Sequence, residues 1–317
     1  MIGKDLSLAI RLLNAGELVA IPTETVYGLA ANGLDPLSVS KIFVAKNRPY
    51  FDPLILHLDS TVHLLELVDE MPHYAERLAE HFWPGPLTML LPKSQLVPDV
   101  VTAGSPLVAV RVPNHPLTLE LLKALSFPLA APSANPFGYI SPTRAEHVEA
   151  QLGDKISYIL DGGLSEIGLE STIVDCSGDE PVVKRLGGIT IDALSNCLGF
   201  EPKVDIQSHS NPSSPGLLDQ HYAPRKPLYL VEDIEAFCQA HSGKSILYLS
   251  FGANTCPEGV YEMNLSPKGD LIEAASHLFH YMRALDSHSG DCIVAKRLPD
   301  NGLGKAINDR LYRAAHK

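Results

Sequence analysis

The sequence predicts an α/β protein made of two domains joined by a linker, and three observations support this fold class. The chain has 317 residues, which is long for one domain and sufficient for two. Hydrophobic residues make up 45% and charged residues 20%, a composition typical of a packed core. Helix-like and strand-like patterns flank residues 207–216, which are rich in Ser and Pro and have no apolar period. We therefore expect a first domain over 1–205, a linker over 206–225 and a second domain over 226–317.

The first domain opens with a helix over residues 5–15, where apolar side chains recur at helical spacing. Asp35 or Ser38 caps a second helix that ends before Pro49, and a third covers 72–82. The expected strands are apolar runs at Leu18–Ile21, Leu54–Leu58, Leu87–Leu91, Val108–Val112, Pro128–Ala131, Ile156–Leu160, Ser171–Val174 and Val182–Lys184. Since helices and strands do not alternate strictly, we expect an α+β domain with a twisted open sheet.

The second domain has a more regular order of elements. The expected strands are Leu228–Val231, Ile246–Leu249, Tyr261–Asn264 and Cys292–Ala295. The expected helices are Ile234–Ala240, Leu271–Leu285 and Gly304–Ala315. This alternation is typical of a small three-layer α/β domain, Rossmann-like, with a parallel sheet.

Composition excludes several classes of protein. The formal net charge of −12 argues against bulk nucleic acid or an anionic membrane as the main partner, because both require a basic surface. The five cysteines are odd in number, widely spaced and free of C-x-x-C pairs, so we expect no zinc site, no disulfide framework and a cytoplasmic setting. No apolar run reaches the length of a membrane span, and the charged start is not a signal peptide.

Two cationic residues and one histidine are the first candidates for binding chemistry. Lys46 and Arg48 precede Pro49 and could hold phosphate oxygens, or they could mark a solvated helix end. His57 lies within an apolar strand, where it is either a core histidine or a hydrogen-bonding group at the floor of a pocket.

Two polar segments follow apolar strands. Pro22–Thr25 could line a ligand site or cap a turn. Ala130–Pro136 combines small residues with two prolines, so Ser133 and Asn135 could bond phosphate and ribose, or form an ordinary turn.

Further candidates depend on burial. Arg111 lies inside a strand pattern and needs an anionic partner, either a substrate carboxylate or an internal Asp or Glu. Ser171 enters a strand, and Arg185 closes another and could reach a phosphate. Tyr222 could cover a ligand pocket or dock the linker. The sequence lacks a P-loop and a G-x-G-x-x-G turn after a strand, so ATP would not be held in either common way. It also lacks a Ser–His–Asp signature, a nucleophile elbow and H-E-x-x-H, so a covalent intermediate is not expected.

Taken in order, these motifs resemble the YrdC-like family, in its long, two-domain form of threonylcarbamoyl-AMP synthases. The matching segments are Pro22–Leu29, Lys46-x-Arg48-Pro49, Ser133-x-Asn135, Leu169–Asp175, Ser214–Gly216 and His221–Pro224. The resemblance implies a nucleotidyltransferase that converts L-threonine, bicarbonate or CO2 and ATP into threonylcarbamoyl-AMP and pyrophosphate, for t6A modification of tRNA. It also implies Mg²⁺ with ATP, a downstream tRNA threonylcarbamoyl transferase of the TsaD type, weak or indirect tRNA contact and no membrane partner.

The resemblance also assigns residues. Lys46 and Arg48 would be catalytic, and no residue is a certain metal ligand. Threonine would be held by Thr25, His57, Arg111, the Ala131 backbone and Ser171. ATP would be held by Lys46, Arg48, Asp52, the Leu107 backbone, Ser133, Asn135, Ser141, Arg185 and Tyr222, the last in a candidate lid.

Two positions depart from the family pattern. Asp52 replaces an asparagine, and a carboxylate repels polyphosphate unless a proton or Mg²⁺ intervenes. Asn47 replaces a glycine, and asparagine tolerates the left-handed conformation that glycine often adopts. The alternatives to the synthase are a carbamoyl-AMP-forming relative, an RNA-binding module and a regulatory protein that binds the same ligands without chemistry.

Overall fold

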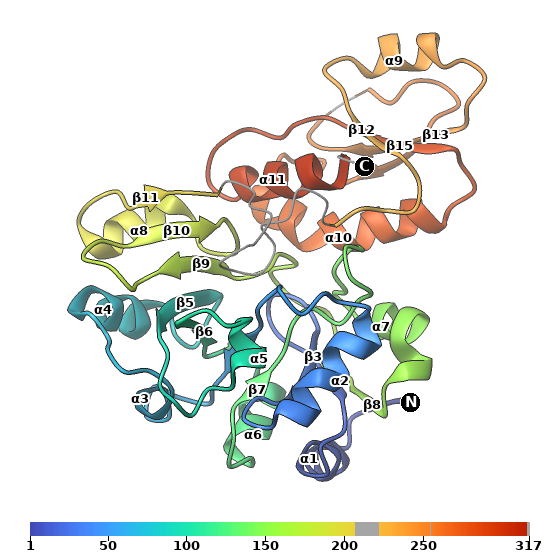
Figure 1. Cartoon of the computed structure of the whole chain (residues 1–317). Coiled ribbons are helices and arrows are strands. Elements are labelled where there is room, and N and C mark those ends of the chain that lie inside the picture. The colour runs from blue at the N-terminus through green and yellow to red at the C-terminus, as the bar shows by residue number, and fades with distance from the viewer. Residues whose placement is uncertain (207–221, 254, 316–317) are drawn as a thin grey trace. The chain divides into compact units, whose positions relative to one another are not determined.

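The computed structural model describes residues 1–206, 222–253 and 255–315 (Figure 1). Contacts within the chain divide it into two compact units. The first contains Met1–Phe137, Ser141–Glu166 and residues 170–206, and the second contains the described residues from 222 onward. Two short segments of the N-terminal half, Gly138–Ile140 and Ile167–Leu169, group with the second unit, which the sequence did not indicate. Most of the expected linker, with Ser214–Gly216 and His221, lies outside the described residues.

The first unit contains eleven strands in one sheet together with short helices. Its strands are β1 (Ile2–Gly3), β2 (Val19–Ile21), β3 (Gly28–Asn32), β4 (Ile55–His57), β5 (Leu87–Pro92), β6 (Leu107–Arg111), β7 (Leu129–Ala130), β8 (Tyr158–Leu160), β9 (Thr172–Asp175), β10 (Val182–Arg185) and β11 (Lys203–Val204). Its helices are α1 (Leu6–Asn14), α2 (Pro36–Lys46), α3 (Leu64–Leu67), α4 (His73–Phe82), α5 (Asp99–Thr102), α6 (Pro116–Lys123), α7 (Ala145–Leu152), α8 (Ile191–Leu198) and the 3-10 turn η1 (Gly153–Lys155).

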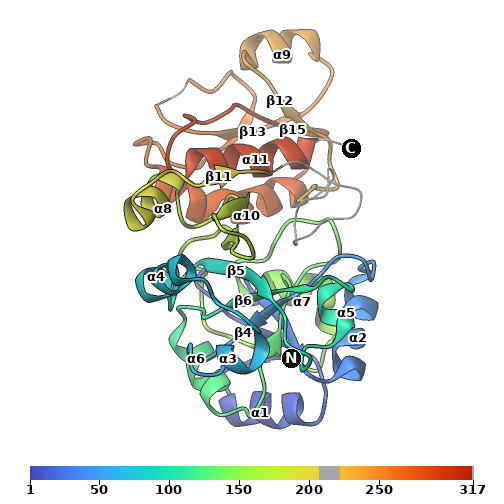
Figure 2. The ribbon, with the colours of Figure 1, turned by 60° about the vertical axis from the view of Figure 1, so that its left-hand side comes forward.

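The strand order of this sheet is β1-β8-β2-β3-β7-β4-β6-β5-β9-β10-β11, so neighbours in space are rarely neighbours in sequence. Parallel and antiparallel pairs are mixed: β4 is parallel to β6, and β5 is antiparallel to β6 and parallel to β9. This mixed, open sheet confirms the fold class expected for the first domain, and Figure 2 shows β4, β5 and β6 side by side.

One face of the sheet is covered by α1 and α6. Ala9 and Leu13 of α1 and Leu121 of α6 are fully buried in a cluster that includes Val19 and Ile21 of β2. Asp5 starts α1 by accepting a hydrogen bond from the Leu8 backbone, as an N-cap residue does. This layer therefore forms from the apolar stripe that the sequence displays over residues 5–15.

Several elements were not expected from the sequence. The helices α6, α7 and α8 contain eight residues each, too few for a strong periodic signal. The strand β3 has the sequence GLAAN, which has little intrinsic preference for strand, and it forms because β2 and β7 pair with it on either side. The expected strand at Pro128–Ala131 is shorter, Leu129–Ala130, and Ser171 precedes β9 rather than starting it.

The second unit is a three-layer α/β domain, as expected. Its strands are β12 (Leu228–Leu230), β13 (Ile246–Ser250), β14 (Tyr261–Asn264) and β15 (Cys292–Ala295), and its helices are α9 (Ile234–Ala240), α10 (Leu271–Ser287) and α11 (Gly304–Ala315). All pairs in the order β12-β15-β13-β14 are parallel. Helix α9 lies on one side of this sheet, and α10 and α11 lie on the other (Figures 1 and 2).

Aspartate caps begin two helices of the second unit. Asp233 and Asp270 accept backbone hydrogen bonds at the first turns of α9 and α10. All five cysteines of the chain are free thiols. Across the described ranges, each helix is too short or too polar to cross a bilayer.

Candidate functional site

The candidate site lies at one end of four central strands of the first unit, next to a small apolar cluster. Ile55, Leu90, Ala109 and Ile173, one from each of β4, β5, β6 and β9, are buried together, with Leu107 packed against them. Side chains two positions apart on a strand point to the same face of a sheet. The residue two positions further along each strand toward the same end therefore continues this face.

These continuing positions are all polar. They are His57, Thr88, Arg111 and Ser171. The pairing of β4 with β6 places His57 directly beside Arg111. On β5 and just before β9, Thr88 Oγ1 and Ser171 Oγ form a hydrogen bond of 2.7 Å. The strand register therefore assembles three of the residues predicted for threonine binding, with Thr88 as a fourth member that the sequence did not indicate.

Arg111 is fixed by hydrogen bonds from two of its nitrogens. Nη1 donates to Thr25 Oγ1 at 2.9 Å and Nε donates to the Gly85 carbonyl at 3.2 Å. Thr23 donates its hydroxyl proton to the Val26 carbonyl at 2.6 Å, so in its 2.8 Å contact with Thr25 it must accept. Thr25 thus donates to Thr23 and accepts from Arg111, and its hydroxyl orientation is determined.

Glu24 is the anionic partner of Arg111. Glu24 Oε1 lies 2.6 Å from Arg111 Nη2, and the two side chains are 5% and 4% exposed. Of the two alternatives that the sequence left open for Arg111, the structure contains the internal carboxylate. The ion pair also shows that Glu24 belongs to the site, although the sequence marked only its segment and not the residue itself.

His57 is a neutral histidine in this cluster. Burial lowers the pKa of His57 to about 3, and the nearby charge of Arg111 acts in the same direction. Its Nδ1 lies 3.2 Å from the Ile55 carbonyl. The imidazole is therefore a hydrogen-bonding group and not a charge at the floor of the site.

Arg185 reaches the site because β10 contains a bulge. Val183 pairs with Val174, but the next pair joins Arg185, not Lys184, to Ile173. The extra residue of the bulge shifts the pairing register of β10 by one position. Arg185 therefore lies on the face that carries Ile173. Arg185 Nε then donates to the Ser171 carbonyl and Nη2 to Ser171 Oγ, both at 3.0 Å.

Lys46 is a buried cation and not a solvated helix end. It is 1% exposed, and Nζ donates to the backbone carbonyls of Ser133 and Asn135. Burial lowers the pKa of Lys46 well below its usual value, and neighbouring Arg48 lowers it further. The next residue, Asn47, ends α2 with φ of 52°, so it adopts the left-handed conformation that asparagine tolerates.

Arg48 and Asp52 form a second buried ion pair. Arg48 Nη2 lies 2.8 Å from Asp52 Oδ2 and also donates to the Pro53 carbonyl at 2.8 Å. Burial raises the pKa of the Asp52 carboxyl, and the cations Arg48, Lys46 and Arg185 oppose this shift. These three cations are therefore close enough to act on one carboxylate, and together they form a positively charged group in a chain of net charge −12.

Ser141 is held by a carboxylate that the sequence did not single out. Ser141 Oγ donates to Glu170 Oε1 at 2.6 Å, and both residues are buried. Because Glu170 immediately precedes Ser171, this bond joins the predicted ATP and threonine residues within one connected network. A single buried acidic residue leaves no periodic signal in the sequence, so only the tertiary structure identifies this bond.

Two predicted residues lie apart from this cluster. Leu107 starts β6, four residues before Arg111, which is roughly 13 Å along the strand. Tyr222 belongs to the second unit, where it is fully buried, stacks on Phe279 at 5.5 Å and lies under Arg310 at 5.2 Å. Its contacts agree with the docking interpretation, and its contact with ATP stays a prediction.

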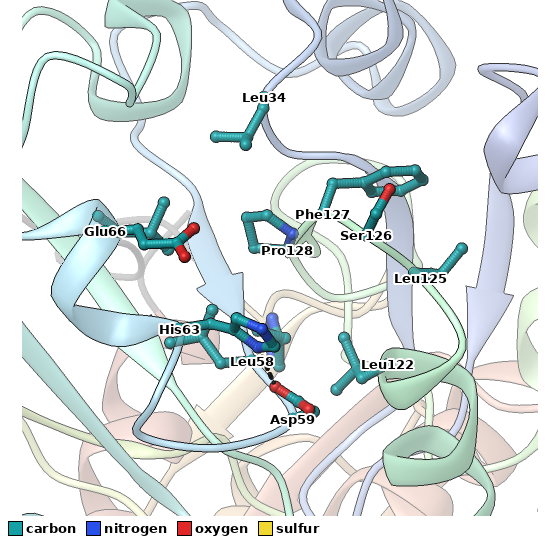
Figure 3. Close-up of a pocket in the computed structure, with 12 residues that line it drawn as sticks. Leu34, Leu58, Asp59, His63, Glu66, Leu122, Leu125, Ser126, Phe127 and Pro128 are labelled. Carbon is teal, nitrogen blue, oxygen red and sulfur yellow. Dashed lines mark hydrogen bonds and ion pairs between the residues drawn. The ribbon is translucent and has the colours of Figure 1, made fainter.

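A separate pocket adjoins the site and is not the site itself. Of the predicted residues, only His57 lines it (Figure 3). Apolar side chains, among them Leu34 and Leu122, face a polar rim where His63 Nδ1 lies 2.7 Å from Asp59. The bond with Asp59 raises the pKa of His63. This pocket therefore lies beside the end of β4, and Lys46, Arg48 and Arg185 do not line it.

Comparisons with known proteins agree with the geometry. Residues 11–187 match the Sua5, YciO and YrdC family model, described as telomere recombination, and residues 189–316 match the C-terminal domain of threonylcarbamoyl-AMP synthase. The chain is 40% identical to the threonylcarbamoyl-AMP synthase of Pyrococcus abyssi, over 97% of this chain and 93% of that protein. It is also 40% identical to the Bacillus subtilis enzyme of the same name, over 98% and 93%.

A solved structure extends the agreement to the fold. The crystal structure of P. abyssi Sua5 complexed with L-threonine matches with a TM-score of 0.91 and 38% identity, covering 98% of this chain and 94% of that one. The match spans both units, as do the two family models. The chain therefore belongs to the threonylcarbamoyl-AMP synthase family, in the form that carries the additional C-terminal domain.

Proposed function

We propose that the protein is an L-threonylcarbamoyladenylate synthase, which forms threonylcarbamoyl-AMP and pyrophosphate from L-threonine, bicarbonate or CO2 and ATP. The observation that supports this most strongly is the set of buried cations in the first unit: Arg111 on β6, and Lys46, Arg48 and Arg185, whose charges all act on Asp52. Family membership over nearly the full chain supports the same reaction. The product serves the t6A modification of tRNA.

The charges of the reactants explain the residues. Threonine adds through its amine to CO2 or bicarbonate and becomes a carbamate, whose oxygen attacks the α-phosphate of ATP and expels pyrophosphate. Nucleophile and target are both anionic, so orientation and charge neutralisation are the main tasks of the protein. We assign neutralisation to Lys46, Arg48 and Arg185, and threonine binding to Thr25, His57, Arg111, Ser171 and the Ala131 backbone.

The remaining ATP contacts follow from the same network. Ser133 and Asn135 belong to the turn whose carbonyls bind Lys46, so their own polar atoms lie next to that cation. Ser141 is joined to this region through Glu170. We propose these three side chains for the nucleotide, together with the Leu107 backbone and Tyr222, and Asp52 as the counterion that holds Arg48 beside them.

Magnesium enters the reaction as part of the ATP substrate. Within the described ranges no three His, Cys, Asp or Glu side chains gather as a metal-binding group. Mg²⁺ requires few protein ligands when phosphate oxygens fill its coordination sphere. Asp52 is the carboxylate nearest to the cationic group, but its pairing with Arg48 makes it a counterion first.

Product analysis tests the proposal directly. The protein is incubated with threonine, bicarbonate, Mg²⁺ and ATP, and the products are identified by mass spectrometry. We expect threonylcarbamoyl-AMP and pyrophosphate, and neither without threonine. Pyrophosphate release or a carbamoyl-AMP product that does not require threonine would indicate the carbamoyl-AMP-forming alternative. Binding of both ligands without pyrophosphate release would indicate a regulatory protein.

The product also determines the partner. Threonylcarbamoyl-AMP is a mixed anhydride, which hydrolyses in water, so an acceptor enzyme must consume it promptly. We propose a tRNA threonylcarbamoyl transferase of the TsaD type as that partner, with little direct tRNA contact by this acidic chain. Weak tRNA binding at physiological salt is the expected result in a filter-binding or fluorescence titration.

A further inference from the structure

Glu24 occupies an unusual position for a carboxylate. It is 4% exposed, yet in the described part of the chain neither of its oxygens accepts an aligned hydrogen bond. It forms an ion pair with Arg111, at 2.6 Å, and its charge also acts on His115. A buried carboxylate normally needs several donors, because burial removes the water that would otherwise bind its lone pairs. The hydrogen-bonding capacity of Glu24 is therefore incompletely satisfied by the protein's own groups.

The ligand proposed for this place is a zwitterion. Threonine carries a carboxylate and an ammonium on one carbon atom, so a buried site for it requires an anion as well as a cation. Arg111 supplies the cation, and the adjacent Thr25 hydroxyl is fixed between Thr23 and Arg111. His57 is neutral, and Glu170 is bound to Ser141. Among the described residues bonded to Arg111, Glu24 is the one that carries a negative charge.

We infer that Glu24 is a further substrate-binding residue, which receives the ammonium group of threonine while Arg111 receives its carboxylate. The two side chains neutralise each other as an internal ion pair, and threonine would replace this one ion pair with two. The inference rests on the proposed function, because it assumes threonine as the ligand. It adds the residue that distinguishes an amino acid from a hydroxy acid that lacks the ammonium group.

The test compares two ligands in two variants by isothermal titration calorimetry on the full chain. The ligands are L-threonine and (R)-3-hydroxybutyrate, which keeps the carboxylate and the hydroxyl of threonine but lacks the ammonium. In the wild type we expect threonine to bind more tightly. In Glu24→Gln we expect threonine binding to weaken about 30-fold. The affinity for 3-hydroxybutyrate should stay the same or increase, since the carboxylate that competes for Arg111 is gone.

Two results would overturn the inference. Equal weakening of both ligands would show that Glu24 only positions Arg111, and unchanged threonine binding would show that it contacts no ammonium. If Glu24→Gln does not fold, Glu24→Asp decides, because it keeps the charge but withdraws it by one methylene. In Glu24→Asp, the ratio of the affinity for threonine to that for 3-hydroxybutyrate should fall about tenfold relative to the wild type. An unchanged ratio contradicts the inference.

The controls separate this inference from the proposed function. Glu17→Gln makes the same chemical change at an exposed residue paired with Lys41, and both affinities should equal those of the wild type. Product formation is measured in the same wild-type preparation. A wild type that makes no threonylcarbamoyl-AMP contradicts the proposed function, whereas an active enzyme whose Glu24→Gln variant keeps its ligand preference contradicts this inference alone.

Discussion

At the scale of single residues, the site is governed by charges that are buried before any ligand arrives. Arg48 and Arg111 each contact a carboxylate, Asp52 and Glu24, at 2.8 and 2.6 Å. Leaving a guanidinium buried without an anion would cost several kcal/mol. The internal carboxylates thus hold both arginines in position for anionic substrates. Each substrate must compete with an internal carboxylate for its cation.

This competition predicts the effect of Asp52→Asn on ATP binding. The amide can still occupy the space of the carboxylate, but it no longer neutralises Arg48 or repels phosphate. We expect the KM for ATP to fall about tenfold, equivalent to about 1.4 kcal/mol, with the KM for threonine unchanged. Steady-state pyrophosphate release measures both constants. A higher KM for ATP would show instead that Asp52 supports the nucleotide through Mg²⁺, and Asp99→Asn, at an exposed pair with Lys93, is the neutral control.

His57 predicts a pH dependence of stability. Its pKa falls from 6.5 to about 3 on folding, so between these values the unfolded chain binds a proton that the folded chain does not. The free energy of unfolding should therefore decrease as the pH falls from 6.5 toward 3, by at most about 1.4 kcal/mol per pH unit from this residue. Urea melts at several pH values should show that the free energy of unfolding changes less with pH in His57→Gln than in the wild type. A histidine NMR titration gives the direct check, because His63 should titrate above 6.5 while His57 does not titrate above pH 5.

At the scale of elements, small local irregularities orient the functional side chains. The bulge in β10 turns Arg185 toward Ser171, and the left-handed Asn47 ends α2 directly after Lys46. Gly187 lies just beyond the bulge, where the chain passes so close to its neighbour that a Cβ atom would lie 2.3 Å from the Glu170 carbonyl oxygen and 2.5 Å from the Thr172 nitrogen. No side chain fits there without moving the segment that carries Ser171.

Substitution of this glycine is the test at the element scale. Gly187→Ala should push residues 170–172 away from β10 and cost about 1–3 kcal/mol of stability. It should also raise the KM for both substrates, because Ser171 and Glu170 lie on the displaced segment. Thermal melting and steady-state kinetics measure the two effects. Gly178→Ala is the matched control, since its nearest contact would be 4.0 Å away, and equal behaviour of the two variants would contradict the explanation.

At the scale of the whole molecule, two loops of the N-terminal half belong to the second unit. Tyr139 donates to Asp286 at 2.6 Å, Arg283 donates to the Ile140 carbonyl, and Gly168 lies against the α10 backbone. Ser141 follows directly after one loop and Glu170 directly after the other. The second unit therefore anchors both ends of the Ser141–Glu170 hydrogen bond through the covalent chain.

This anchoring predicts that changes in the second unit alter ATP kinetics. Tyr139→Phe removes the hydroxyl that bonds to Asp286, and we expect the KM for ATP to rise about threefold or more as the Ser141 loop loosens. The KM for threonine should change less. Tyr261→Phe, at an exposed tyrosine of β14, is the control for loss of a hydroxyl. Equal KM values for Tyr139→Phe and wild type would contradict the anchoring.

Deletion of residues 206–317 is the broader version of this experiment. It removes Tyr222 and all partners of the two loops, so turnover should fall strongly even when residues 1–205 remain folded. Circular dichroism establishes whether they do, and pyrophosphate release measures the turnover. Unchanged kinetics in a folded truncated protein would contradict a contribution of the second unit to catalysis.

The sequence by itself determined what depends on neighbours along the chain. Apolar periodicity defined α1 and the alternating elements of the second unit, because side chains three or four positions apart share a helix face wherever the helix lies. Family motifs indicated the residue types of the site and the reaction. The residue type of Asn47 is compatible with its left-handed conformation, and the end of α2 decides that this conformation is adopted.

Only the tertiary structure decided which charges meet. Arg111 and Glu24 are 87 positions apart along the chain, and Ser141 and Glu170 are 29 apart, so no periodic pattern connects them. The strand β3 and the pairing of two loops with the second unit were hidden for the same reason. Such contacts depend on strand order and register, which follow from the packing of the entire sheet. The sequence therefore identified the cations of the site, and the fold identified their anions.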